Sequence, residues 1–482
     1  MKRTRIIAAG TVALVTLLVA GVFLAPALRS RAASSTTSSS TLQFVPTVQL
    51  APESNLTTAA GSYACTTPAP VVHYSSFHCY TPADIYAAYG VGALHAEGIT
   101  GKGETIIIAD SYGSPTVQHD LDMFSDTFGL PRTTVTIINA NGTPTYNNSV
   151  NGSPPGWAFE TSLDVQWAHA IAPDAHIVLV EGNPAETEGV QGFPSLFRGE
   201  EMAIQQYPGA VLSQSFAVTE QSFQSAGSTQ VARFEKVYQE AVANHVTVFG
   251  SSGDTGTANG DKQGRVYPYP TVNWPSSDPL VTSAGGTWLQ YGWRWNPTSP
   301  TDLTYEETPG QSVEAVWNEP YFGVATGGGR SVLFPMPDFQ SNISSSLLQG
   351  ARGLPDVSWN AAVNGGVLVY TSFGGTRVGW HIVGGTSASS PQLAAVVALT
   401  NQLADSMGKQ HVGYLNPYLY KMPASAFNDI VPETFGAVTI KDNSQYGSGI
   451  AGYDATTGYD LTTGFGSPKA DAFVHDLAAM LP

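Results

Sequence analysis

The sequence predicts an α/β fold with a doubly wound, mostly parallel sheet and helices on both faces of that sheet. Short apolar runs rich in branched residues recur along the chain, and helix-like patterns separate them. The 50 glycines and 32 prolines are scattered between these runs and follow no repeat. Alternation of strands and helices over a long chain is typical of α/β proteins.

The strand candidates are short and apolar, as buried parallel strands are. They are residues 105–109, 175–180, 210–212 and 246–249. Helical spacing of apolar residues covers residues 160–170, 233–244 and 391–403. Because helices separate the strands, we expect each strand to join the next through a crossover, which gives parallel pairing.

Composition limits the partners and the environment. The chain has 482 residues, 12% of them charged, and a formal net charge of −17. Phosphate backbones repel such a chain, so we expect no nucleic-acid partner. Few basic groups are left unbalanced when carboxylates protonate, which limits self-repulsion in acid. The composition therefore suits a globular protein that works in an acidic environment.

The N-terminus predicts export. Lys2, Arg3 and Arg5 precede an apolar run over residues 6–28, which small residues follow. The run approaches the length that spans a bilayer, so residues 1–33 are either a cleaved signal peptide or an uncleaved signal anchor. We expect a secreted, extracellular protein. The alternative is a protein anchored to the outer face of the cell membrane, the one case in which a membrane is a partner.

Residues 34–79 form a Ser/Thr/Pro-rich segment without apolar periodicity, and up to about residue 60 they predict a flexible tether. Cys65 and Cys79 are the only cysteines, and in an exported chain they can close a disulfide. No comparable linker follows, so residues 80–482 predict a single domain.

Ser387 is the first candidate for chemistry. It follows Gly384, Gly385 and Thr386, and Pro391 opens an apolar helical stretch. Unpaired N–H groups and the dipole at a helix N-terminus favour a developing oxyanion. A loop serine that caps a helix gives the same pattern, so the interpretation depends on finding a base that activates the hydroxyl.

Carboxylates are the candidates for that base. Glu160 and Asp164 lie four residues apart on a predicted helix and therefore share a face among apolar neighbours. Close carboxylates share a proton, which raises one apparent pKa. Taken alone, the spacing fits an exposed acidic helix equally well. Asp254 follows a strand in a glycine-rich turn; turn chemistry explains it, but a protonated aspartate there can also donate to an oxyanion.

Together these segments resemble the sedolisin family of serine-carboxyl peptidases. The resemblance rests on the order Glu, Asp, Asp, Ser of the four candidates and on stretches 80–85, 101–106, 171–175 and 463–468. It implies a subtilisin-like fold and a monomeric endopeptidase that cleaves proteins or peptides in acid through an acyl-enzyme on Ser387. It also implies that Glu160 is the general base, that Asp164 orients it and shares its proton, and that Asp254 completes the oxyanion hole.

The resemblance extends to a substrate strand and a metal site. Ser215, Phe216 and Ala217 match the substrate-lining strand, with alanine where glycine is common. One structural Ca²⁺ ion is implied, held by two carboxylates and three backbone carbonyls. The corresponding residues are Asp429, Ile430, Thr456, Gly458 and Asp460. A similar Gly-Tyr-Asp run ending at Asp454 leaves a second alignment open.

One departure from the family concerns activation. Sedolisins generally carry a long folded prosegment, whereas about 45 residues separate the export signal from the domain here. We therefore expect no full-length prodomain.

Two other functions remain as alternatives. One is an ordinary subtilisin-like peptidase that uses Asp110, a histidine and Ser387, although none of the ten histidines stands in the usual motif. The other is a non-catalytic exported binding protein on the same scaffold. A nucleotide site at residues 101–103 is weaker, because the rest of a phosphate-binding fingerprint is missing.

Overall fold

The computed structural model describes residues 77–140, 142, 154–182, 193–223, 228–261, 263–373 and 378–482, and four short strands before them. Those strands are β1 (Val45–Pro46), β2 (Gln49–Leu50), β3 (Leu56–Thr57) and β4 (His73–Tyr74). All belong to the unit Ala32–Pro482. The other unit, Met1–Arg31, carries most of the predicted export signal and lies outside the described residues. Within the described parts, no helix is long and apolar enough to cross a membrane.

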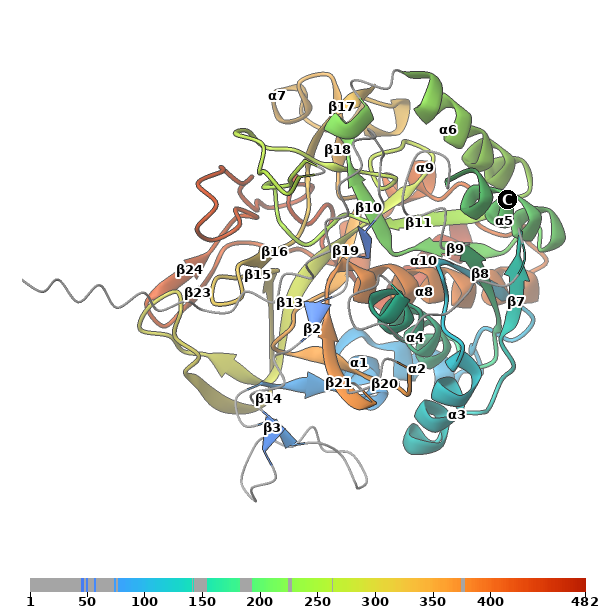
Figure 1. The fold of residues 1–482 in the computed structure, drawn as a ribbon, viewed down its shortest axis with the longest axis horizontal. Helices are drawn as coiled ribbons and strands as arrows, with labels where there is room; N and C mark the ends of the chain where they lie inside the picture. The colour runs from blue at the N-terminus through green and yellow to red at the C-terminus, as the bar shows by residue number, and fades with distance from the viewer. Residues whose placement is uncertain are drawn as a thin grey trace, which may run out of the picture. The chain divides into compact units, whose positions relative to one another are not determined.

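An eight-stranded, mostly parallel sheet carries the candidate site (Figure 1). Its order is β14-β13-β11-β9-β6-β8-β7, and β19 also pairs with β13. The strands are β6 (Thr105–Ser111), β7 (Thr136–Asn139), β8 (His176–Gly182), β9 (Val211–Gln214), β11 (Thr247–Ser251), β13 (Thr282–Trp295), β14 (Tyr305–Val316) and β19 (Val357–Asn360). Within this described sheet, only β13 and β14 pair antiparallel. The four predicted strands are confirmed.

Helices cover both faces, as predicted (Figure 1). On one face lie α4 (Pro154–Ile171) and α8 (Thr386–Ser406), with α10 (Ala470–Met480) against α8. On the other lie α5 (Phe193–Gln206) and α6 (Ser228–Ala243). Successive side chains of β6 point to opposite faces of the sheet, so each face has its own hydrophobic core. Ile106 and Ile108 pack in the core under α4 and α8, and Ile107 and Ala109 pack in the core under α5 and α6.

The helix that carries the candidate serine begins earlier than predicted. α8 starts at Thr386, so Ser387 lies in its first turn and Pro391 lies inside the helix. Proline has no N–H to donate to the carbonyl four residues back, which is why the sequence suggested a helix start at Pro391. The surrounding protein tolerates it, because the side chains from Thr386 to Asn401 are all buried.

Smaller elements complete the chain. β20 (Gly366–Thr371) and β21 (Gly379–Gly384) form a second sheet with β2 and β5 (Cys79–Tyr80), and β10 (Phe216–Thr219) lies between β1 and β12 (Asn273–Trp274). The remaining helices are α1 (Pro82–Tyr89), α2 (Val91–Ala96), α3 (Val117–Phe128), α7 (Ser345–Leu348) and α9 (Asn416–Leu419). The remaining strands are β15 (Asn318–Glu319), β16 (Val324–Ala325), β17 (Gly329–Pro335), β18 (Ala351–Leu354), β22 (Phe427–Asn428), β23 (Glu433–Phe435), β24 (Val438–Ile440) and β25 (Ser467–Pro468).

Part of the predicted tether makes strand contacts, which corrects that expectation. β1 pairs antiparallel with β10, and β2 pairs antiparallel with β21. The sequence hides these contacts because pairing along a sheet edge uses backbone groups and needs no apolar periodicity.

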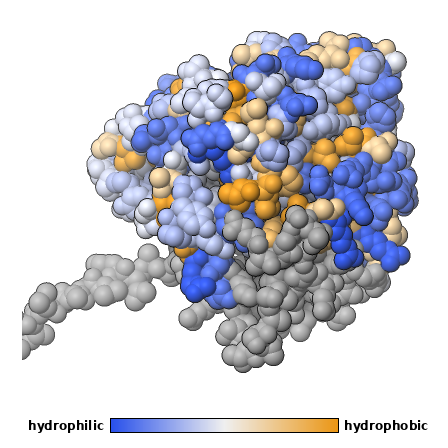
Figure 2. All heavy atoms as spheres, turned by 90° about the horizontal axis from the view of Figure 1, so that it is seen from above, coloured by the Kyte–Doolittle hydropathy of each residue, from blue (hydrophilic) through white to orange (hydrophobic). Residues whose placement is uncertain are grey.

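The surface is polar with scattered apolar side chains. Figure 2 shows one face, on which apolar residues occur in small groups among polar ones. The exposed large apolar residues, such as Ile137, Val332 and Tyr446, are far apart in the sequence. Single exposed apolar residues are ordinary on soluble proteins, so we assign no docking surface to them.

Candidate active site

The four predicted catalytic residues come from three segments that meet at one place. Glu160 and Asp164 lie on α4, Ser387 lies in the first turn of α8, and Asp254 follows β11. α4 and α8 pack against each other on the same face of the sheet. Glu160, Asp164 and Ser387 are 0% exposed and Asp254 is 5% exposed. The exposed-helix interpretation of Glu160 and Asp164 is therefore wrong.

Glu160 faces the hydroxyl of Ser387. Burial raises the pKa of Glu160 well above its usual value, and Asp164 and Asp110 raise it further, whereas the contact with Ser387 lowers it. Neither Glu160 oxygen makes a hydrogen bond of full geometry. Catalytic hydrogen bonds are often long in a resting site and tighten when substrate binds, so this arrangement suits a base awaiting its substrate.

Asp164 lies one helical turn from Glu160 and is equally buried. Burial raises its pKa well above the usual value, the charge of Asp110 raises it further, and contact with the hydroxyl of Ser215 lowers it. Because the two carboxyls interact, they titrate as a pair and a shared proton can reside on either one. Ser215, predicted only as part of the substrate strand, thus also touches the carboxylate pair.

A fourth carboxylate, Asp110, also lies in the site. The sequence did not predict this position for it. It lies at the carboxyl end of β6 and is 0% exposed. Burial raises its pKa to about 7, with Thr161 lowering it and Glu181 raising it. No histidine among the described residues hydrogen-bonds to Asp110. The alternative of an ordinary subtilisin-like peptidase needs a histidine held by Asp110, so this observation argues against it. Its place at a strand's carboxyl end, where α/β proteins build their sites, was the signal available in the sequence.

Asp254 is fastened to the residue before Ser387. Its Oδ1 accepts hydrogen bonds from the amide and the hydroxyl of Thr386, at 2.9 and 3.0 Å. The Thr386 hydroxyl in turn accepts from the amide of Gly253 at 2.9 Å. Gly253 has a φ of +107°, and a side chain there would collide with Asn273, so only glycine fits this turn. The predicted neighbourhood of Asp254 and Ser387 therefore has a defined geometry.

Two short strands of the N-terminal segment pair with the edges of β10 and β21. Val45 and Pro46 pair with Ala217 and Phe216 of β10. Gln49 and Leu50 pair with Gly384 and Val383, just before α8. Of the predicted substrate strand, Phe216 and Ala217 thus already pair with an extended segment of the chain.

Four of the five predicted calcium ligands, Asp429, Thr456, Gly458 and Asp460, lie on or contact the loop between residues 456 and 460. The Gly458 amide donates to both oxygens of Asp429, at 3.1 and 3.0 Å, and the Thr456 amide donates to Asp460 at 3.0 Å. Asp460 is 1% exposed, and burial raises its pKa to about 6. The side chain of Ile430 is buried, which leaves its carbonyl as the group it can offer. Two carboxylates, one at the end of this loop and one in contact with it, fit the preference of calcium for oxygen ligands.

The alternative alignment through Asp454 does not fit. Asp454 is exposed and forms an ion pair with Lys441 at 3.0 Å, and its backbone bridges to Asp442. Asp460, and not Asp454, ends the loop that Asp429 contacts through Gly458.

Comparisons with known proteins show which proteins the chain resembles. The chain is 31% identical over 356 residues to kumamolisin from Bacillus sp. (strain MN-32), covering 73% of this chain and 56% of that protein. It is 27% identical over 378 residues to sedolisin from Pseudomonas sp. (strain 101), covering 76% of this chain and 57% of that protein. No family model matches the chain. It thus spans little more than half the length of these relatives.

A solved structure has the same fold. Pseudomonas sedolisin, in complex with two molecules of pseudo-iodotyrostatin, superposes with a TM-score of 0.64 at 24% identity, covering 84% of this chain and 99% of that one. The fold and the buried set of one serine and several carboxylates define the class of serine-carboxyl peptidases. Within that class, the chain belongs to the sedolisin family.

Proposed function

We propose that this chain is an acid-acting serine-carboxyl endopeptidase that hydrolyses peptide bonds in proteins or peptides. The observation that carries the proposal is the contact of the Ser387 hydroxyl with the buried carboxyl of Glu160. A serine hydroxyl is a weak nucleophile until a neighbouring base takes its proton. Glu160 is that base, and Asp164, one helical turn away, shares its proton and orients it.

In acylation, Ser387 Oγ attacks the peptide carbonyl while its proton passes to Glu160. Collapse of the tetrahedral intermediate breaks the C–N bond, and the proton passes from Glu160 to the departing amine. Water then attacks the acyl-enzyme, again giving a proton to Glu160, and the released Ser387 recovers its own. Asp110 holds a further carboxyl beside the pair and helps to keep it protonated in acid.

The oxyanion is stabilised by the amide of Ser387, near the N-terminus of α8, and by a protonated Asp254. Removal of one such donor typically costs a factor of about 10²–10³ in rate. The hydrogen bonds from Thr386 hold Asp254 beside the amide of the next residue. An ionised Asp254 would repel the oxyanion, which is one reason to expect activity in acid.

Endopeptidase action is supported by the pairing of β1 and β2. The two strands occupy edges of β10 and β21, so an extended peptide that replaces them finds backbone partners on both edges. Ser215, Phe216 and Ala217 then line the part of the cleft that precedes the cleaved bond.

The remaining features are proposed on the same basis. One structural Ca²⁺ ion is bound by Asp429 and Asp460 with the carbonyls of Ile430, Thr456 and Gly458. The chain is exported, and Cys65 pairs with Cys79; Cys79 is not a free thiol, and Cys65, which lies outside the described residues, is the only other cysteine.

The test is hydrolysis of an unfolded protein at acidic pH by the wild type, Ser387→Ala and Glu160→Ala. We expect the rate of each variant to fall at least about 10³-fold. The nucleophile and its base act as one unit, so removing either residue removes the contribution of both. Thermal melting of each variant provides the folding control. Activity near the wild-type level in either folded variant would overturn the assignment.

A further inference from the structure

A second cluster of ionisable side chains lies away from the candidate active site. Glu104 precedes β6, Asp405 lies near the end of α8, and His411 follows that helix. His411 Nε2 lies 3.1 Å from Asp405 Oδ1 and 3.7 Å from Glu104 Oε2. Glu104 directly precedes β6, which carries Asp110 near its other end, and Asp405 lies on α8, which carries Ser387 in its first turn. Asp405 lies 18 positions after Ser387 on α8, about 27 Å at the rise of an α-helix.

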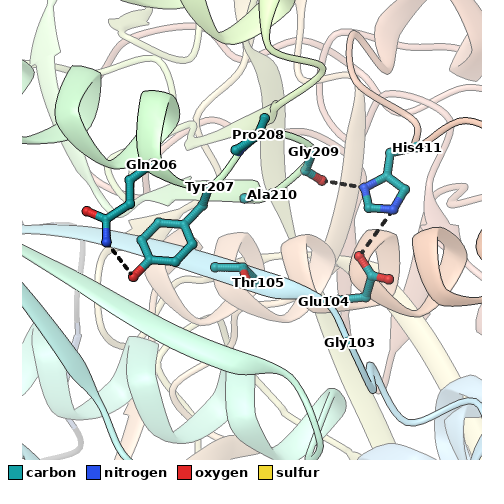
Figure 3. A pocket seen from close by; sticks show the side chains of 9 residues that line it. All are labelled: Gly103, Glu104, Thr105, Gln206, Tyr207, Pro208, Gly209, Ala210 and His411. Atoms are coloured by element: carbon teal, nitrogen blue, oxygen red, sulfur yellow. Dashed lines mark hydrogen bonds and ion pairs between the residues drawn. The ribbon is translucent and has the colours of Figure 1, made fainter.

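His411 is oriented by a backbone carbonyl. Its Nδ1 lies 2.9 Å from the carbonyl oxygen of Gly209, as Figure 3 shows. A carbonyl only accepts hydrogen bonds, so Nδ1 donates to Gly209 and Nε2 faces the two carboxylates. Without a cation Nε2 lies within hydrogen-bond distance of Asp405, and in the neutral ring with its proton on Nδ1 it offers a lone pair to a cation placed there. Gly209 permits this approach, because its φ is +83° and a Cβ there would lie 2.5 Å from Nδ1. Histidines that bind metals are commonly held by such a bond from the other ring nitrogen.

Glu104 is the unusual member of the cluster. It is 3% exposed, and no described residue donates a hydrogen bond to its carboxylate; its nearest charged partner is His411 Nε2. Its carboxylate lines the cavity beside His411, and a cation there would offset the cost of its burial. A proton on Nε2 satisfies Asp405, but Glu104 at 3.7 Å is beyond hydrogen-bond distance. An ion at the centre of the three atoms contacts all of them.

We propose that Glu104, Asp405 and His411 bind a divalent transition-metal ion of the zinc type. Bonds of about 2.1 Å to a tetrahedral ion place ligand atoms about 3.4 Å apart, close to the two separations observed here. One imidazole with two carboxylates is a ligand set that zinc accepts. A cavity of about 220 Å³ adjoins Glu104 and His411, with room for water at the fourth position. The ion ties the start of β6 to the end of α8.

The chain contains an internal control. Glu97, Asp471 and His475 also bring three such groups together, but all three residues are exposed. There His475 Nδ1 contacts the Asp471 carbonyl in its own helix, and no buried carboxylate faces the ring. This second cluster has the same residue types without the features that carry the proposal.

The test is titration of the full-length Ser387→Ala chain with Zn²⁺ at neutral pH, where an imidazole ligand is neutral. Excess Ca²⁺ keeps the proposed calcium site filled, and Ser387→Ala prevents self-digestion. We expect one tight equivalent of Zn²⁺ and a higher melting temperature in its presence. Asp405→Asn, at an exposed position, should weaken binding at least about tenfold without unfolding the chain, and Glu104→Gln should do the same.

His475→Ala should leave the affinity and the stoichiometry unchanged. The proposal is overturned if no equivalent of Zn²⁺ binds. It is also overturned if Asp405→Asn and Glu104→Gln bind as tightly as their parent, or if only His475→Ala loses the ion.

Discussion

The amide and the hydroxyl of Thr386 both donate hydrogen bonds to the same oxygen of Asp254, at 2.9 and 3.0 Å. The residue before the candidate nucleophile thereby fixes the carboxyl proposed to face the oxyanion. The same hydroxyl also accepts a hydrogen bond from Gly253. The nucleophile helix and the turn after β11 are therefore joined at a single side chain.

Thr386→Val tests this joint, because valine keeps the shape and the backbone amide but removes the hydroxyl. One lost hydrogen bond is worth about 1–1.5 kcal/mol, so kcat should fall about tenfold with little change in KM. Steady-state kinetics in acid provide the measurement, and Thr386→Ser, which retains the hydroxyl, should stay close to the wild type. An unchanged kcat in the valine variant would show that the joint has no catalytic role.

Stability should be higher in acid than at alkaline pH. Burial raises the pKa of Glu200 to about 8 and those of Asp278 and Glu319 to about 7. A carboxyl whose folded pKa is raised stabilises fully below its unfolded pKa of about 4, and that stability is lost as pH rises through the folded value. His78 and His169 act oppositely, since burial lowers both pKa values to about 4 and their stability is lost as pH falls from about 6.5 through 4.

Scanning calorimetry of the Ser387→Ala chain checks this prediction. The melting temperature should be higher near about pH 5 than near about pH 8, because the carboxyls outweigh the two histidines over that range. Glu200→Gln, which cannot ionise, should reduce the fall. A melting temperature that rises from acid to alkaline pH would contradict the assignment of these buried carboxyls.

Calcium should stabilise the fold through Asp460. Chelation should lower the melting temperature of the wild type, and Asp460→Asn should melt lower and respond little to chelation, since calcium binding adds to stability only where the site exists. Asp454→Asn is the matched control, because its exposed ion pair with Lys441 contributes at most about 1 kcal/mol. Equal responses of both variants to chelation would argue against the assigned ligands.

The strands β1 and β2 should compete with substrate. A chain that begins after Leu50 lacks both strands and leaves the edges of β10 and β21 unpaired. Its initial rate on a peptide substrate in acid should exceed that of a chain beginning just before Val45, which keeps both strands. If the two chains hydrolyse the peptide at the same initial rate, with no difference in any delay before the steady rate, the strands do not obstruct the cleft.

The fold and most of the site could be predicted because they depend on local patterns. Branched apolar runs placed β6, β8, β9 and β11, and the spacing of Glu160 and Asp164 placed both on one helix face. The bond between Thr386 and Asp254 could not be predicted, because it joins residues 132 positions apart. The pairing of β1 and β2 was missed because it depends on backbone groups alone.

The sequence also did not predict which ionisable side chains are buried together. Asp110 follows an apolar run, but only the packing of α4 against β6 brings it to the carboxyl pair. The cluster around His411 unites residues from positions 104, 405 and 411, which no local pattern connects.

The pH dependence of kcat/KM on a peptide substrate, from about pH 3 to about pH 8, tests the central claim most directly. A carboxylate base paired with a protonated Asp254 predicts a high rate in acid that falls steadily toward neutral pH, and no detectable rate in Ser387→Ala. A rate that is low in acid and rises through a single group near pH 7 would indicate a histidine base and contradict the roles proposed for Glu160 and Asp254.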